Sequence, residues 1–80
     1  MMSKLQSSNK VIGLKQSGKA IKEGLASVVF IAKDAESRVT QPIETLCREC
    51  GVTIEYVDTM RALGDACGIE VGAAVAVMLK

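Results

Sequence analysis

The apolar residues of the first 32 positions gather in short runs that are separated by glycines and lysines. Runs at Lys10–Ile12 and Val28–Ala32 predict strands, and the second run is continuously apolar, which is typical of a strand buried on both faces. Leu14–Glu23 lies between them and predicts a helix. Gly13 ends the strand before this helix, and Gly24 stands just past its end, where glycine is favoured.

The middle of the chain predicts a loop followed by a longer helix. The polar segment Asp34–Ser37 predicts the loop. The helix begins at Ser37 or Thr40 and runs to Cys50, because aliphatic residues and cysteines recur at helical spacing and a glycine follows. We place Pro42 in its first turn, where the missing N–H costs little.

The last third of the chain also alternates between predicted strands and helices. Val52–Val57 predicts a strand with apolar and polar residues on opposite faces. Thr59 predicts the cap of a short helix that Gly68 closes, and Ala73–Leu79 predicts the last strand. Near the N-terminus, Ser3–Asn9 predicts a short, frayed helix.

Strands that alternate with helices predict a three-layer α/β/α sandwich around a roughly four-stranded sheet. Helical connections between strands favour right-handed crossovers, so part of the sheet should be parallel and the sheet mixed. The chain has 80 residues and no linker or repeat, and we therefore expect a single domain over residues 1–80.

Hydropathy gives no export or membrane signal. The N-terminal residues lack the central apolar stretch of a signal peptide, and the longest apolar run, Val71–Leu79, is about half of the ~20 residues that a membrane span needs. We therefore expect a soluble, cytoplasmic protein with no membrane partner.

The residue types leave little chemistry for catalysis. The chain has no histidine, which excludes Ser–His and Cys–His pairs and a proton shuttle at neutral pH. Lys19 follows Gly18 but is itself followed by alanine, so the segment is not a Walker-type phosphate loop. We expect a non-enzymatic protein without a cofactor.

Three cysteines invite a metal or redox interpretation. Cys47 and Cys50 have CxxC spacing, but zinc usually takes four Cys or His ligands and only Cys67 remains. The pair also falls at the end of a predicted helix, whereas a reactive thiol is favoured at a helix start. We interpret the cysteines as structural, with a thiol or metal protein as the alternative.

Charge is unevenly distributed along the chain, although the net charge is only +1. Residues 1–33 hold six lysines against one glutamate, a balance of +5. Residues 34–80 hold four basic residues against eight acids, a balance of −4. This asymmetry indicates a polarised molecule with one basic face.

The segment from Gly13 to Lys22 concentrates that basic character. Lys15, Lys19 and Lys22 stand at i, i+4 and i+7 and share one helix face, while Gly13 lets the backbone approach a partner closely. The helix N-terminus favours phosphate, and lysine with Gln16 suits the edges of guanine and adenine. A solvated lysine face, or one that docks an acidic protein, is the alternative.

Stacking residues are scarce. Phe30 and Tyr56 are the only aromatic residues, and both fall in predicted strands. A reader of unpaired bases usually exposes several aromatics, so structured RNA is the better expectation.

Three segments resemble a known family when taken together and in order. They are Gly13–Ala20, Val29–Glu36 and Leu63–Ala74. The chain is similar over about Val11–Leu79 to the kink-turn-binding ribosomal proteins of the L7Ae and L30e type, and most closely to their short bacterial members. The resemblance implies an α/β/α sandwich that binds RNA kink-turns, in which a three-nucleotide bulge precedes tandem sheared G·A pairs.

The resemblance also implies roles for particular residues. Lys15, Gln16 and Lys19 occupy the family's Asn-Glu-x-x-Lys reading motif, and Lys15 and Gln16 in place of Asn and Glu imply a different sequence preference. Glu36 matches an acid that contacts an extruded base. A loop that covers the bulge is matched by Ile69, Glu70, Val71 and Gly72.

We therefore expect a monomeric, ribosome-associated bacterial protein that stabilises a kink-turn in ribosomal or regulatory RNA. In addition to the residues named above for base recognition, we expect Gly13 to let the backbone approach the RNA closely. We expect Lys22 and Lys33 to contact phosphates.

Overall fold

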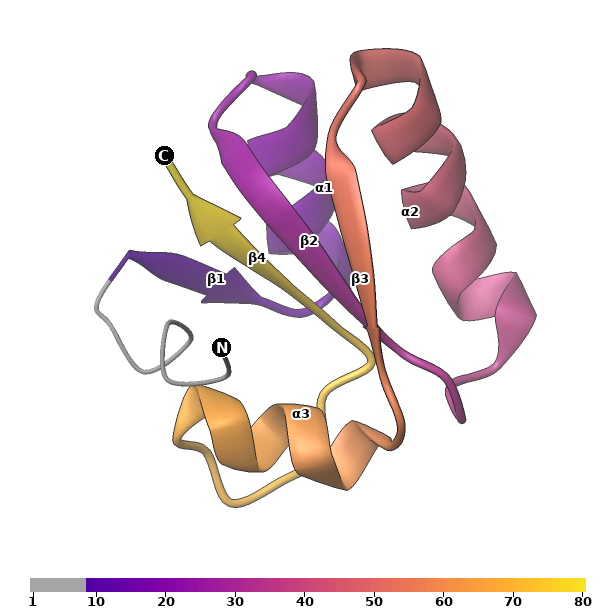
Figure 1. Cartoon of the computed structure of the whole chain (residues 1–80), viewed down its shortest axis with the longest axis vertical. Coiled ribbons are helices and arrows are strands. Elements are labelled where there is room, and N and C mark those ends of the chain that lie inside the picture. The colour runs from indigo at the N-terminus through magenta and orange to yellow at the C-terminus, as the bar shows by residue number, and fades with distance from the viewer. Residues whose placement is uncertain (1–8) are drawn as a thin grey trace.

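The computed structural model describes residues 9–80, which form four strands and three helices (Figure 1). The elements in chain order are β1 (Lys10–Ile12), α1 (Leu14–Lys22), β2 (Ala26–Ala32), α2 (Ser37–Cys50), β3 (Thr53–Val57), α3 (Met60–Cys67) and β4 (Val75–Leu79). The helix expected over Ser3–Asn9 lies outside the described residues except for Asn9 itself. The other predicted elements are all present.

The four strands form one mixed sheet in the order β1-β4-β2-β3. Strand β2 pairs with β3 in parallel, and α2 makes the crossover between them. Strand β4 pairs antiparallel with β1 on one side and with β2 on the other. The C-terminal strand thus lies inside the sheet, between two strands from the first half of the chain.

Helices cover both faces of the sheet, which confirms the three-layer sandwich (Figure 1). Val29 and Ile31 on β2 point to the face covered by α1 and α2, where they pack with Ile21 and Ile43. The alternate residue Phe30 packs on the other face, against α3. Each fully buried aliphatic side chain stabilises the fold by about 1.5–3 kcal/mol relative to an exposed one.

Three local expectations were wrong. Strand β2 begins at Ala26, two residues before the start of the apolar run that predicted it. Helix α2 begins at Ser37, so Pro42 is its sixth residue and lies inside the helix rather than in the first turn. Proline cannot donate to the carbonyl of Arg38, but both residues are exposed, so water can serve that oxygen. The last strand begins at Val75, two residues later than expected, because residues 73 and 74 still belong to the loop after α3.

The C-termini of α2 and α3 end as the sequence predicted. Gly51 and Gly68 follow the two helices with φ angles of +69° and +79°, the left-handed conformation that glycine adopts at no steric cost. No helix in the 9–80 region is long and apolar enough to cross a lipid bilayer.

Candidate nucleic-acid interface

The N-terminus of α1 is open. Gly13 precedes it with φ +100° and, as a glycine, provides no side-chain cap for the first turn. The first bond along the helix runs from the Ser17 amide to the Gly13 carbonyl at 3.0 Å. The amides before Ser17 therefore have no helical acceptor, and together with the positive end of the helix dipole they favour an anion.

Two backbone hydrogen bonds bring three segments to the same end of the sheet. The amide of Gly13 donates to the carbonyl of Val75 at 3.0 Å, which fixes the start of α1 beside the start of β4. The amide of Ala32 donates to the carbonyl of Ala74 at 2.9 Å, which fixes the end of β2 there as well. The start of α1, the start of the β2–α2 loop (residues 33–36) and the residues just before β4 consequently lie at the same end of the sheet, and residues 69–72 form the loop that leads into β4. We call this last segment the covering loop.

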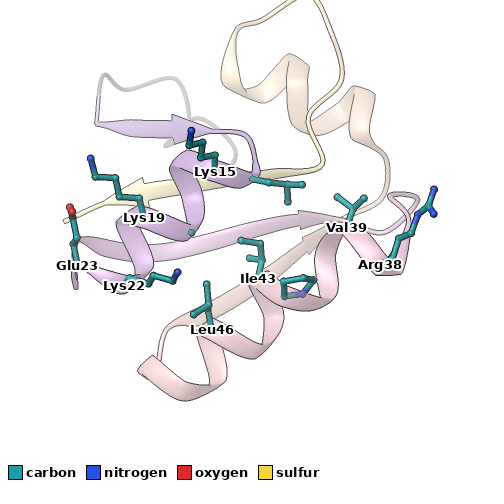
Figure 2. A pocket seen from close by; sticks show the side chains of 11 residues that line it. Lys15, Lys19, Lys22, Glu23, Arg38, Val39, Ile43 and Leu46 are labelled. Carbon is teal, nitrogen blue, oxygen red and sulfur yellow. The ribbon is translucent and has the colours of Figure 1, made fainter.

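Side chains of α1 project in two directions. Lys15, Gln16 and Lys19 are exposed on the first two turns. In Figure 2 the side chains of Lys15 and Lys19 extend away from α2, whereas Lys22 extends toward it. Lys22 is also the last residue of α1, about 12 Å along the axis from Leu14 at 1.5 Å per residue. Lys22 therefore lies apart from the three converging segments.

A groove of about 820 Å³ lies between α1 and α2 (Figure 2). Apolar side chains that include Val39, Ile43 and Leu46 line it from α2, and lysines line it from α1. Gly18 adds no side chain to this groove, so the two helices leave space between them. The groove continues the basic surface of α1 toward its C-terminal end.

The β2–α2 loop carries two ion pairs, both exposed. The ammonium group of Lys33 lies 3.5 Å from the carboxylate of Asp58. The Nε atom of Arg38 donates to an oxygen of Glu36 at 2.7 Å. Exposed pairs of this kind contribute little stability, typically about 0–1 kcal/mol, so both Lys33 and Glu36 can exchange their partners for a ligand.

The covering loop presents one apolar side chain to solvent. Val71 is 70% exposed, and Glu70 and Gly72 are exposed beside it. Ile69 instead is half-buried and packs against the core under α3. The loop thus anchors itself through Ile69 and leaves Val71 free for a partner.

The three cysteines are free and lie in different surroundings. Cys47 and Cys67 are buried, and burial raises the pKa of both thiols above the ordinary value. Cys50 is exposed, contrary to its expected place on the apolar face of the helix. No group of three His, Cys, Asp or Glu side chains suited to a metal ion occurs among residues 9–80.

The sequence predicted no role for two residues that lie near these three segments. Asp34 falls in the predicted loop, and its Oδ1 atom accepts a hydrogen bond from the Met60 amide at 2.8 Å. Gly64 lies inside α3 against the backbone of the covering loop. A glycine inside a helical pattern is a visible signal of close backbone approach, whereas nothing local signals a contact between positions 34 and 60.

The fold and this site define a small α/β/α protein whose open helix end suits a phosphate-bearing partner. The chain matches the family model described as "Ribosomal protein L7Ae/L30e/S12e/Gadd45 family" over residues 2–80. It belongs to this family, as the resemblance in the sequence implied. Membership places it among non-enzymatic proteins, in agreement with the expectation from its residue types.

Individual relatives agree with the family match. An RNA-binding protein of Caldanaerobacter subterraneus is 49% identical over 67 residues, which cover 84% of this chain and 82% of the relative. An RNA-binding protein of Bacillus pumilus is 48% identical over 75 residues, 92% of each chain. The structure described as "Giardia lamblia 15.5kD RNA binding protein" superposes with a TM-score of 0.91 at 25% identity, covering 99% of this chain and 70% of that one.

Proposed function

We propose that this protein binds RNA and that it recognises and stabilises a kink-turn. The observation that carries the proposal is the convergence of the uncapped α1 N-terminus, the β2–α2 loop and the covering loop at one end of the sheet. A kink-turn offers matching features, namely phosphates, G·A base edges and an extruded base. Family membership and the RNA-binding relatives support an RNA partner.

Each segment would contact a different part of the RNA. The free amides of α1 and the ammonium group of Lys15 would hold phosphates, and Gly13 would let the backbone come close. Gln16 and Lys19 would reach base edges at the G·A pairs, where lysine donates to guanine and glutamine pairs with adenine. Phosphate contacts would supply affinity, and the base edges would supply selectivity.

The two loops would enclose the extruded base. The carboxylate of Glu36 would accept a hydrogen bond from it once Arg38 is displaced or shifts. Val71, with Ile69 beneath it, would give the base an apolar surface, and Glu70 and Gly72 would complete the loop around it. Lys22 and Lys33 would contact phosphates further along the RNA.

The cellular setting forms part of the same proposal. We propose a cytoplasmic protein of bacterial type that acts as a monomer, on ribosomal RNA or a regulatory RNA. The alternative of a module that docks an acidic protein through its lysines is not favoured, because the relatives carry the name of RNA-binding proteins.

Shape selectivity tests the proposal. Titrations at one fixed salt concentration would compare a kink-turn RNA with a plain duplex of equal length and with the same RNA after its G·A pairs are replaced by Watson–Crick pairs. We expect tight binding to the kink-turn alone. Equal affinity for all three RNAs would refute kink-turn recognition, and no measurable affinity for any of them would refute RNA binding.

A further inference from the structure

Asp34 makes a contact across the proposed site that its exposed loop position does not suggest. Its Oδ1 atom accepts a hydrogen bond from the amide of Met60, 26 residues later in the chain, at 2.8 Å. Met60 is the first residue of α3, so its amide is one of the donors that a helix leaves without an internal partner. A carboxylate there also interacts favourably with the positive end of the helix dipole.

This contact is a second cap on a helix that already has one. The hydroxyl oxygen of Thr59 accepts a hydrogen bond from the amide of Ala62 at 3.0 Å, which is an ordinary local cap. Thr59 is adjacent to the helix in sequence, whereas Asp34 comes from the β2–α2 loop. The local cap serves α3 alone, and the contact from Asp34 joins two different parts of the molecule.

Met60 also holds the covering loop, through its carbonyl group. The carbonyl of Met60 accepts a hydrogen bond from the amide of Ala73 at 3.0 Å, directly after the covering loop. The backbone of the loop also lies close to Met60, since a side chain at Gly72 would come within 3.1 Å of the Met60 Cβ atom. Met60 therefore lies between Asp34 and the end of the covering loop, and its backbone bonds to both.

We infer that Asp34 is a positioning residue of the RNA site. Its carboxylate holds the first turn of α3 against the β2–α2 loop, and α3 in turn holds the covering loop. The separation between Glu36 and Val71, which the proposed function places on either side of one extruded base, then follows from this chain of bonds. The inference rests on the proposed function for its RNA consequence, but the coupling between the loops is a property of the free protein.

The negative charge of Asp34, taken by itself, predicts the opposite effect on RNA affinity. An acid beside an RNA surface repels phosphates, so removing the charge of Asp34 should tighten RNA binding if its charge is all that matters. If Asp34 positions the loops, Asp34→Ala should weaken kink-turn binding. Asp34→Asn separates the two effects, because the amide oxygen of asparagine can still accept the bond from Met60 while the charge is lost.

Thr59→Ala is the matched control, because it removes a cap from the same helix without touching the link to the β2–α2 loop. We expect Asp34→Ala to lower kink-turn affinity by roughly three- to tenfold, in the range of substitutions that act through coupled contacts. Asp34→Asn and Thr59→Ala should stay within about twofold of the unsubstituted protein, less than the smallest of those effects. Tighter binding by Asp34→Ala, or an equal loss in Thr59→Ala, would overturn the inference.

Hydrogen exchange of the free protein tests the coupling without RNA. In Asp34→Ala, the amide of Ala73 should exchange faster although Asp34 does not contact it, and in Asp34→Asn and Thr59→Ala it should exchange as in the unsubstituted protein. Unchanged exchange at Ala73 in Asp34→Ala would overturn the inference even if kink-turn recognition holds. Faster exchange at Ala73 in a protein that does not distinguish a kink-turn from duplex would refute the proposed function and leave the coupling standing.

Discussion

Gly64 lies directly against the main-chain carbonyl group of Val71, so close that a Cβ atom at position 64 would overlap the Val71 oxygen. The backbone conformation at position 64 does not require glycine, because the residue is inside α3 and its φ angle is not positive. Glycine inside a helix costs up to about 1 kcal/mol relative to alanine. The close approach of the covering loop therefore explains this glycine.

Gly64→Ala should displace the covering loop from α3. The overlap involves backbone atoms that no rotamer change can move, so we expect a loss of about 1–3 kcal/mol in the free energy of unfolding, the usual cost of overpacking. Because Val71 moves with the loop, kink-turn affinity should fall about tenfold, equivalent to about 1.4 kcal/mol. Urea unfolding and RNA titration measure the two effects. A variant with unchanged stability and affinity would contradict the contact.

Gly18→Ala is the matched substitution in the other helix that carries an interior glycine. A Cβ atom at Gly18 would lie 3.8 Å from Leu46 and 3.9 Å from Ile43, which is ordinary van der Waals contact. We expect the free energy of unfolding to rise by about 0.5–1 kcal/mol from helix propensity. Thermal unfolding measures this gain, and a lower melting temperature would show that the groove between α1 and α2 does not tolerate a methyl group.

The lysines of α1 should separate into two classes. Lys22 lies at the far end of α1 from the converging segments, so Lys22→Ala should weaken binding to all RNAs about equally and reduce the salt slope by about one contact. Gln16→Ala and Lys19→Ala should cost about 1–3 kcal/mol on the kink-turn and much less on duplex RNA. Titrations of both RNAs at several salt concentrations distinguish these outcomes. If all three variants lost affinity equally and only through the salt-dependent contribution, α1 would bind any polyanion without reading bases.

The cysteines should differ in reactivity. Iodoacetamide should add one adduct to the native protein, at the exposed Cys50, and three adducts in denaturant, because Cys47 and Cys67 are buried. Mass spectrometry counts the adducts, and Cys50→Ser should leave the native protein unmodified. A second adduct in native protein would contradict the burial of the other two thiols.

Alkaline pH should destabilise the fold through the same two buried thiols. Burial raises the pKa of Cys47 and Cys67 in the folded state above the ordinary thiol pKa of 9.0. Above pH 9.0 the unfolded chain loses these protons before the folded chain does, so the free energy of unfolding falls as the pH rises. Urea unfolding at a series of pH values from 8 to about 10.5 measures the fall. Double replacement of both thiols by alanine should flatten it, and an unchanged slope in that variant would assign the effect to other groups.

Local sequence determined the secondary structure of the described chain almost completely. Apolar periodicity and the glycines after each helix predicted α1, α2 and α3, because helix phase and helix termination depend on residues a few positions apart. The position of Pro42 was wrong because the helix begins three residues earlier than the later of its two candidate starts. The open, lysine-bearing start of α1 was also predictable, since it is a feature of one helix alone.

Only the tertiary structure decided which segments meet. The insertion of β4 between β1 and β2 depends on burial of the whole sheet, and this pairing brings Gly13 beside Val75. Tyr56 shows the same dependence. It shares a strand face with the partly buried Ile54 but is 52% exposed on the edge strand β3, where its hydroxyl donates to Glu44 at 2.6 Å. The bond from Met60 to Asp34 joins residues 26 positions apart, so no local pattern encodes it and only the packed fold creates it.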